Sequence, residues 1–482
     1  MLACSHIDGH GRAFNGFRER ANEAMIRLFN VYYPTRTIVL LLCEALIVGG
    51  CFLVATMILT GPDTYLVLNY EYGWLKIVCL IVLALLFSYY FDLYEPQRIS
   101  ERWEIYFRLL LVLGFLSFFL SGVIYMFPGA DIANSVLLLG LIFLTIALVA
   151  WRSAYQWIIG RDAFRERVYV LGAGERAQMV VDILRNRKDA GMEIVGFGSF
   201  EHDMSERPDA FQAAVADLDG SRHHVDRVIV ALEDRRGSLP LRELLKLRFN
   251  GVVIEEAGTL LERLTGKLYL DGLRPSNFIY SEGFRVKPSQ QIARRLVSTL
   301  TALAGLLIFL PFLPFVILAV RLSSPGPIFF RQTRVGQGGR NFTVYKFRTM
   351  RQDAEASGAK WATKNDPRVT GLGMFMRKTR LDEVPQLWNV LRGDMGFVGP
   401  RPERPEFVPW LSEQIPYFDL RHMIRPGLTG WAQVRYGYGA TLAESREKLE
   451  FDLYYIKHMT LGLDLLIMFE TIKTIIRRRG AQ

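Results

Sequence analysis

Two adjacent carboxylates in the last third of the chain, Asp382 and Glu383, are the residues best suited to chemistry. The pattern predicts that Asp382 begins a helix running to about Leu391. A carboxylate at a helix N-terminus is favoured by the helix dipole and stays ionised at neutral pH, and the free N–H groups beside it can hold a phosphate. An ionised carboxylate can attack phosphorus and form an acyl phosphate. The structural alternative is that Asp382 is only an N-cap and Glu383 a first-turn acid.

Cationic side chains surround this pair in the sequence. Phosphoryl transfer depends mainly on positioning and charge neutralisation, which arginine and lysine supply. Arg401 stands between Pro400 and Pro402, which stiffen the backbone around it. For each cation the alternative is a solvated surface charge. The candidates for substrate binding are Lys346, Arg348, Arg377, Arg401, Arg425 and Gln433.

Composition points to a membrane. The chain has 482 residues, half of them hydrophobic, and a formal net charge of +10. Four apolar runs, at about 37–60, 75–92, 106–126 and 134–151, are each near the length that crosses a bilayer. Basic residues alternate between the connecting segments, so the positive-inside rule places the leader and everything after residue 152 in the cytoplasm. Glu44, inside the first run, is expected to face the bundle and to be paired or protonated.

Several function classes find no support. The chain contains no zinc-finger, RRM or KH pattern, so nucleic acid is not expected as a partner. The four cysteines all lie at or before Cys79, which argues against a disulfide framework and against a thiolate zinc site in the soluble part.

A fifth apolar run, Leu296–Val320, differs from the first four. Both of its flanks are basic, and Pro311 and Pro314 interrupt its second half. Proline removes a backbone donor and bends a helix. We therefore expect a re-entrant helix at about 294–321, which enters the membrane from the cytoplasm and returns. An ordinary kinked span is the alternative.

The middle of the chain alternates between strand-like and helix-like segments. A glycine turn, Gly172-Ala-Gly174, follows the first strand and precedes a helix, as in a permissive dinucleotide-binding fingerprint. We interpret this region as structural or regulatory and leave nucleotide binding open. Asp217 and Asp219 resemble a glycosyltransferase metal motif, but their polar surroundings favour a surface loop.

The expected fold class is a membrane α-helical bundle, an α/β Rossmann-like domain and a mostly helical α/β catalytic domain with a re-entrant membrane helix. The expected boundaries are a cytoplasmic N-terminal segment (1–36), a four-helix transmembrane domain (37–152), the Rossmann-like domain (165–282) and the catalytic domain (288–482).

The C-terminal region contains a dense succession of motifs. In chain order they are Ser324-Pro-Gly-Pro327, Gln332-Thr-Arg334-Val-Gly336, Tyr345-Lys346-Phe347-Arg348, Asp366-Pro-Arg368-Val-Thr370, Arg377-Lys378-Thr-Arg380-Leu-Asp382-Glu383-Val-Pro385-Gln386, Gly399-Pro400-Arg401-Pro402 and Arg425-Pro426-Gly427-Leu-Thr429-Gly430-Trp431-Ala-Gln433. Over about residues 288–482 this succession resembles the bacterial sugar transferase family, the polyprenyl-phosphate hexose-1-phosphate transferases. The apolar runs and the middle domain resemble the long form of that family. Two departures are Asp-Glu-Val-Pro in place of Asp-Glu-Leu-Pro, and Met395-Gly396 in place of Met-Ser.

The resemblance implies a reaction. A sugar 1-phosphate would pass from a UDP-sugar to undecaprenyl phosphate with release of UMP, as the first membrane step of exopolysaccharide, O-antigen or capsule synthesis. Asp382 would be the nucleophile, and Glu383, with Asp382, would hold Mg²⁺. The implied location is the bacterial inner membrane, as a multi-pass protein with its soluble domains in the cytoplasm, and a homodimer is compatible with the family.

Rival functions remain open at this stage. One is a nucleotide-sugar oxidoreductase or dehydratase that uses the Gly172 turn. Others are a non-catalytic membrane scaffold for polysaccharide assembly and an ordinary glycosyltransferase, which would release UDP. The sequence leaves glucose and galactose both open as the sugar.

Overall fold

The computed structural model describes residues 25–95, 102–126, 134–159, 165–172, 174–198, 225–232, 239–281, 283–285, 287–351, 366–437 and 441–477. They form two compact units, which we describe separately: Tyr32–Ala257 belongs to the first, and Arg27–Val31 with Gly258–Gln482 to the second. Asp217 and Asp219 lie outside the described residues.

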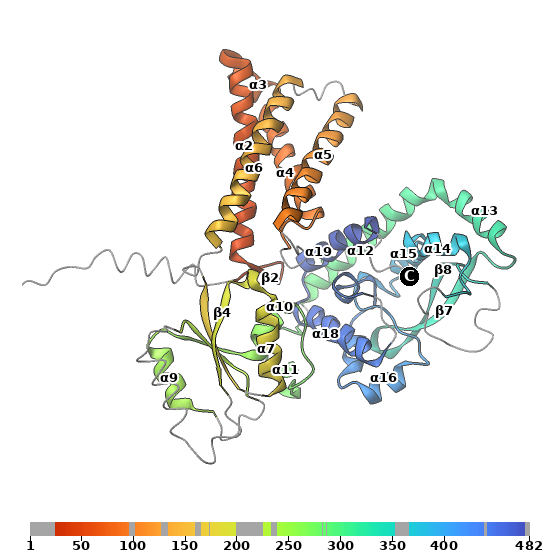
Figure 1. The fold of residues 1–482 in the computed structure, drawn as a ribbon. Coiled ribbons are helices and arrows are strands. Elements are labelled where there is room, and N and C mark those ends of the chain that lie inside the picture. The colour runs from red at the N-terminus through yellow and green to blue at the C-terminus, as the bar shows by residue number, and fades with distance from the viewer. Residues whose placement is uncertain are drawn as a thin grey trace, which may run out of the picture. The chain divides into compact units, whose positions relative to one another are not determined.

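An apolar helical bundle forms the N-terminal part of the first unit (Figure 1). In this bundle α2 packs along α4 and α6, and α5 packs along α4 and α6. Gly140 lies so close to the Phe52 ring that a Cβ there would come within 2.5 Å of it. The bundle helices, with the short helix α3 before α4, are α2 (Thr35–Thr60), α3 (Thr64–Tyr70), α4 (Gly73–Tyr90), α5 (Arg102–Met126) and α6 (Asn134–Ile159).

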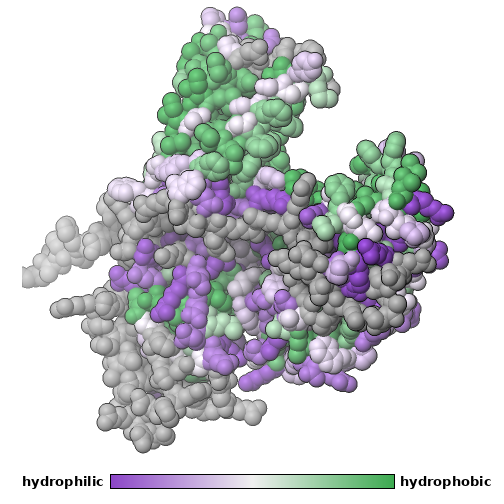
Figure 2. Space-filling view, turned by 45° about the vertical axis from the view of Figure 1, so that its right-hand side comes forward, coloured by the Kyte–Doolittle hydropathy of each residue, from purple (hydrophilic) through white to green (hydrophobic). Residues whose placement is uncertain are grey.

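The outside of the bundle carries many large apolar side chains. Leu46, Leu110 and Phe118 are among these exposed side chains, and Figure 2 shows that hydrophobic residues predominate on the face of the bundle in view. In the described residues five helical segments are long and apolar enough to cross a membrane, the fifth being Pro288–Ser323. The four expected helices are confirmed, and together the five segments indicate a multi-pass membrane protein.

Glu44 is paired inside the bundle, as expected. Only 2% of the residue is exposed. Its carboxylate lies 2.5 Å from the Nε of Arg152 and accepts a hydrogen bond of 2.6 Å from the hydroxyl of Tyr94. The negative charge of Glu44, which lies within an apolar helix, is thereby balanced by the positive charge of Arg152.

A four-stranded parallel sheet forms the rest of the first unit. Its strand order is β4-β3-β5-β6, so the first of these four strands in chain order lies between the second and the third. That order is the doubly wound arrangement of α/β proteins, and the expected parallel α/β region is confirmed. The strands and helices are β3 (Glu166–Leu171), α7 (Glu175–Asn186), β4 (Met192–Gly198), β5 (Arg227–Val230), α9 (Leu241–Phe249) and β6 (Val253–Glu256).

Packing alone accounts for the first glycine of the turn after β3. Gly172 has φ of 142°, and a Cβ there would lie 2.7 Å from the carbonyl oxygen of Ala231. Only glycine lets the chain leave β3 this close to the end of β5. The glycine therefore needs no nucleotide to explain it.

The second unit surrounds two short sheets with helices. β7 (Phe329–Val335) and β8 (Asn341–Phe347) form an antiparallel hairpin, and β9 (Gly396–Val398) pairs in parallel with β10 (Gly427–Thr429). Its helices are α10 (Ala257–Thr265), α11 (Pro275–Tyr280), α12 (Pro288–Phe309), α13 (Leu313–Ser323), α14 (Gly371–Lys378), α15 (Gln386–Arg392), α16 (Val408–Gln414), α17 (Trp431–Arg435), α18 (Leu442–His458) and α19 (Leu461–Ile476).

The fifth apolar segment is broken where its prolines stand. α12 ends at Phe309, a 3₁₀ turn spans Leu310–Phe312, and α13 continues in a new direction (Figure 1). Pro311 lies in the turn and Pro314 in the first turn of α13. Both halves pack on the same unit, α12 on α15 and β9 and α13 on α14. The expected break is confirmed, and the return to the cytoplasm stays a prediction.

Residues 258–281 make their contacts in the second unit, although the sequence pattern placed them at the end of the middle domain. The indole of Trp431 donates to the Gly266 carbonyl at 2.7 Å, and the Leu270 N–H donates to Glu450 at 3.1 Å. Residues just before the first apolar helix join the same unit, where Asn30 donates to the His458 carbonyl at 2.9 Å.

We expect the Glu44–Arg152 pair to be needed for the stability of the bundle. Glu44→Gln should lower the melting temperature in detergent by roughly 6–12 °C, because it leaves a buried guanidinium without a counter-charge. The double variant Glu44→Gln with Arg152→Met should recover most of the loss. An unchanged melting temperature in the single variant would show that the pair does not stabilise the fold.

Candidate active site

Asp382 and Glu383 lie in a 3₁₀ turn, Leu381–Glu383, just before α15. The helix begins at Gln386 with Pro385 as its N-cap, so the prediction that Asp382 starts this helix is wrong. The chain enters the turn through Arg380, whose φ of 58° is left-handed and strained for a residue with a side chain. Both carboxylates are buried, with 6% and 8% of each residue exposed.

Three cations hold Glu383. Its Oε1 lies 2.7 Å from Nη2 of Arg401 and 3.0 Å from Nζ of Lys346, and its Oε2 lies 3.5 Å from Nη1 of Arg380. Burial opposes the negative charge, but Arg401, Lys346 and Arg380 outweigh it and keep the pKa of Glu383 well below its usual value. Glu383 is therefore ionised, and its charge is more than neutralised.

Asp382 is in the opposite situation. In the described part of the chain, its buried Oδ1 has no hydrogen-bond partner. Burial, and then the charge of Glu383, raise the pKa of Asp382 to about 6. The sequence predicted that a helix dipole would stabilise the anion of Asp382. In the structure, the loss of solvent around this carboxylate has the larger effect and raises its pKa. The carboxylate is still mostly ionised at neutral pH and keeps one oxygen free to react.

The strand β8 brings Lys346 to the pair. Asn389 of α15 is fully buried, and its Nδ2 donates to the Thr343 carbonyl at 2.7 Å while its Oδ1 accepts from the Tyr345 N–H at 3.2 Å. Since α15 directly follows the Leu381–Glu383 turn, this amide sets the distance between that turn and the strand that carries Lys346.

Arg401 is supported by a second layer of charges. Its carbonyl accepts a hydrogen bond of 2.9 Å from Nη2 of Arg421. Arg421 is buried and pairs with Asp452 of α18 at 2.9 Å and with Glu403 at 3.7 Å. Asp452 and Arg421 have no signal in the local sequence, and only the packing of α18 shows that they matter.

Arg334 and Arg380 are further cations that the candidate set omitted. Arg334 donates to the Pro402 carbonyl at 3.0 Å, next to Arg401, and burial lowers the pKa of Arg334 to about 10. Both arginines stand within the motif runs of the sequence, so the density of charge there was the available signal.

The other substrate-binding candidates have different surroundings. Arg377 donates to Thr349 Oγ1 at 3.0 Å and lies near enough for its charge to act on Asp382. Arg348 binds the Ser324 carbonyl at the end of α13. Arg425 is exposed beside Arg295, and Gln433 donates to the Leu428 carbonyl at 3.4 Å. In the described residues these last three form no hydrogen bond or ion pair with Asp382 or Glu383.

The arrangement suits a phosphoryl-transfer reaction. A carboxylate with a free oxygen lies beside a cationic shell, which can attract a diphosphate and neutralise its charge. The described residues contain no group of three or more metal-ligand side chains. The two carboxylates could hold Mg²⁺, because this ion commonly takes one or two carboxylates and completes its shell with substrate phosphates and water.

Comparison with known proteins identifies the family. The family model for bacterial sugar transferase matches residues 289–478. The UDP-N-acetylgalactosamine-undecaprenyl-phosphate N-acetylgalactosaminephosphotransferase of Aeromonas hydrophila is 43% identical over 221 residues, 46% of this chain and 52% of that protein. The chain thus spans about half the length of this relative.

Two other relatives match over more of their length. The UDP-glucose:undecaprenyl-phosphate glucose-1-phosphate transferase of Escherichia coli is 32% identical over 351 residues, 68% of this chain and 72% of that protein. The Klebsiella pneumoniae protein of the same name is 27% identical over 426 residues, 84% and 88% of the two chains. With the catalytic unit matched by the family and apolar helices before it, the chain belongs to the bacterial sugar transferase family, in its long form.

Proposed function

We propose that this protein transfers a sugar 1-phosphate from a UDP-sugar to undecaprenyl phosphate, releasing UMP and forming undecaprenyl-diphosphate-sugar at the start of polysaccharide synthesis. The observation that carries the proposal is the buried Oδ1 of Asp382, which has no hydrogen-bond partner in the described part of the chain and lies beside a carboxylate that cations neutralise. The relatives act on different sugars by their names, N-acetylgalactosamine and glucose, so we do not assign the sugar.

The first step uses Asp382 as a nucleophile. Its Oδ1 forms a bond to the phosphorus that carries the sugar, while the bond from that phosphorus to the bridging oxygen breaks and the electron pair leaves with UMP. Lys346 and Arg401, which form ion pairs with Glu383, neutralise the charge of the diphosphate. Burial favours attack, because a carboxylate with one unsolvated oxygen does not have to shed water there before it reacts.

The second step returns the enzyme to its starting state. A phosphate oxygen of undecaprenyl phosphate attacks the same phosphorus, and the carboxylate of Asp382 leaves with the electron pair. One phosphoanhydride replaces another, so no external source of energy is required. Two steps through a covalent enzyme give ping-pong kinetics.

Mg²⁺ is the cofactor that we propose. Asp382 and Glu383 would hold it, and when bound it would withdraw charge from the diphosphate. Arg401 and Lys346 then keep Glu383 ionised and oriented, and Asn389 keeps β8 in place.

We also propose a location for the protein. The bundle would lie in the inner membrane, and α12–α13 would enter and leave it on the cytoplasmic side, where nucleotide sugars occur. Packing of both halves of this segment on one unit supports that placement.

Replacement of Asp382 tests the covalent mechanism. Asp382→Asn should reduce turnover by at least about a thousandfold, equivalent to ~4 kcal/mol in the barrier, because the amide cannot form an acyl phosphate. Wild-type enzyme given UDP-glucose, UDP-galactose or UDP-N-acetylgalactosamine without lipid should release at most one UMP per active site and gain the mass of the sugar phosphate. Asp271→Asn, at an exposed carboxylate, should behave like the wild type. A fully active Asp382→Asn enzyme, or a wild type that releases UMP only when lipid is present, would contradict this mechanism.

The pKa of Asp382 predicts how the first step depends on pH. The reactive form is the anion, so the rate of the UMP burst should be constant above pH 7 and fall about tenfold per unit below pH 6. Lipid is omitted because phosphate monoesters also titrate near pH 6. Lys346→Met should move this fall to higher pH, since the charge of Lys346 lowers the pKa of Asp382. A burst rate that does not change between pH 5 and pH 8 would contradict a raised pKa of Asp382.

Cysteine labelling tests the topology. In a variant without native cysteines, Arg340→Cys should resist an impermeant thiol reagent added outside intact cells, whereas Asp63→Cys, in the exposed turn after α2, should react. Both should react after the membrane is opened. Ready labelling at residue 340 in intact cells would show that Pro288–Ser323 spans the membrane instead.

A further inference from the structure

Two buried amide side chains stand on the short helix α15, and they differ in what they bind. Asn389 is fully buried, and both ends of its amide are hydrogen-bonded to β8, at the Thr343 carbonyl and the Tyr345 N–H. Gln386 is 3% exposed, and in the described part of the chain its Nε2 has no hydrogen-bond partner. A buried donor without an acceptor costs free energy, so this amide calls for a partner of another kind.

Contacts on either side fix the level of Gln386 along β8. Before it in the chain, Glu383 pairs with Lys346 at 3.0 Å. After it, Asn389 accepts from the Tyr345 N–H, one residue earlier in the strand. The helix and the strand therefore run in opposite directions, and Gln386 lies between these two contacts. None of the described residues of this strand accepts a hydrogen bond from its amide.

Gln386 stands four residues after Asp382, about one helical turn away. Val384 and Pro385, which separate them, have right-handed helical dihedral angles, so the chain keeps a helical course from the turn into α15. Residues four apart in a helix have Cβ atoms about 5–6 Å apart, and helical side chains incline toward the N-terminus. We therefore expect the long side chain of Gln386 to incline toward Asp382, whose Oδ1 also has no hydrogen-bond partner among the described residues.

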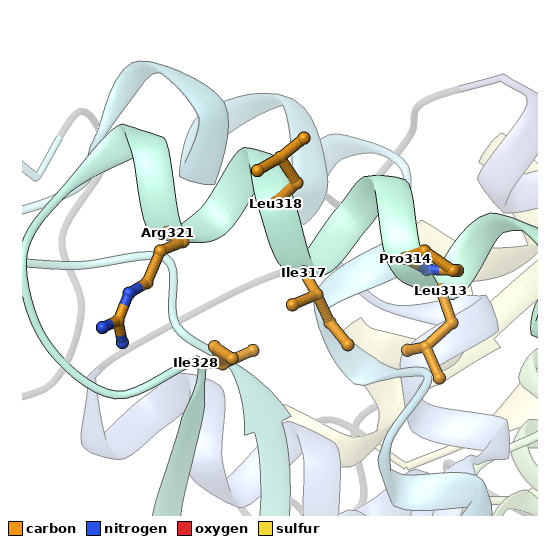
Figure 3. A pocket seen from close by; sticks show the side chains of 6 residues that line it. All are labelled: Leu313, Pro314, Ile317, Leu318, Arg321 and Ile328. Carbon is orange, nitrogen blue, oxygen red and sulfur yellow. The ribbon is translucent and has the colours of Figure 1, made fainter.

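The apolar pocket along α13 does not explain this amide (Figure 3). The pocket has a volume of about 520 Å³, and Gln386 is not among the residues that line it. Its wall is almost entirely hydrocarbon, which offers no acceptor to an amide. The acceptor is therefore to be expected at the turn of Asp382 and Glu383, where the proposed reaction brings phosphate oxygens.

A neutral donor complements the cations that are already present. Lys346 and Arg401 pair with Glu383 and can neutralise a diphosphate. A further cation beside Asp382 would form an ion pair with its carboxylate and hold back the attacking oxygen. The amide of Gln386 carries no charge, and its N–H is directional, so it can fix one phosphate oxygen and leave the carboxylate free.

We propose that Gln386 is a further catalytic residue, whose Nε2 donates a hydrogen bond to a non-bridging oxygen of the phosphorus that Asp382 attacks. The inference rests on the proposed function and adds one residue to its site. In the first step the hydrogen bond holds the phosphorus in line with Oδ1. In the second step it holds the same phosphorus for the lipid phosphate. Lys346 and Arg401 bind the diphosphate, whereas Gln386 acts mainly on the rate at which bonds form.

Gln386→Met tests this assignment on the full chain in detergent micelles, because methionine has a similar volume and lacks the donor. With a UDP-sugar alone, the UMP burst at saturation should be slowed about a hundredfold, as when one transition-state donor is removed elsewhere. The half-saturating concentration of UDP-sugar should stay within about threefold of wild type. Decay of the sugar-phosphate adduct on addition of undecaprenyl phosphate should slow by a similar factor as the burst, since the same phosphorus is attacked.

Thermal stability separates a substrate-binding amide from a structural one. Gln386→Met should melt at the wild-type temperature or above it, because it removes a buried donor that no described residue satisfies. Asn389→Leu, the matched change at the paired amide, should melt at least about 4 °C lower. Gln414→Met, at an exposed glutamine of the same unit, should behave like the wild type in every assay.

Three results would overturn the assignment. A burst rate of Gln386→Met within about threefold of wild type would show that the amide does not act on the first step. A loss of melting temperature as large as that of Asn389→Leu would show that the amide serves the fold. A slow burst followed by adduct decay at the wild-type rate would place Gln386 at the UMP half of the donor. If wild-type enzyme yields no UMP burst with any of the UDP-sugars, the proposed function itself fails, and the role of Gln386 fails with it.

Discussion

Burying two adjacent carboxylates costs free energy that only closely placed positive charges can offset, and the catalytic unit is arranged around this requirement. Glu383 forms ion pairs with Lys346, Arg380 and Arg401. The cations surround Glu383, whereas Asp382 Oδ1 has no hydrogen-bond partner among the residues that the structure describes. The two neighbours thus differ in role through their surroundings: one holds charges in place, and the other keeps a free oxygen and a raised pKa.

Holding three cations on one carboxylate requires several chain segments to meet, and buried polar contacts fasten each of them. Asn389 joins α15 to β8, and Arg421 joins the Arg401 segment to Asp452 of α18. Arg295 of α12 donates to the Val390 and Leu391 carbonyls at the C-terminal end of α15, where free carbonyls carry partial negative charge. The apolar helix α12 therefore supports the same short helix that follows the turn of Asp382 and Glu383.

The tail helix α19 shows how one helix can meet two different environments. Leu463 and Ile467 are buried, and Asp464 pairs with Arg294 of α12 at 2.5 Å. On another face Leu465, Phe469, Ile472 and Ile476 are exposed and recur at helical spacing. The structure has it packed by one face, and its second apolar stripe is compatible with an interface as well.

The local sequence was sufficient for features that depend on short stretches of chain. The four bundle helices follow from apolar runs, the order of strands and helices in the sheet follows from periodicity, and the break after Phe309 follows from Pro311 and Pro314. These effects act over a few residues, so they can be seen without the rest of the molecule. The identity of Asp382 and Glu383 as the central pair came from motif resemblance, and their burial together agrees with it.

Tertiary structure alone decided which of the many cations meet the pair. Lys346 and Arg401 reach Glu383, whereas Arg348 turns to the end of α13 and Arg425 lies exposed beside Arg295. Those distances depend on how β8, α13 and the loops fold back on the catalytic turn, which spacing along the chain does not encode. The same holds for the pKa of Asp382: the sequence suggested a helix N-terminus, but α15 begins at Gln386 and burial raises the pKa instead. Desolvation is a property of everything packed around a group, and it exists only once the chain has folded.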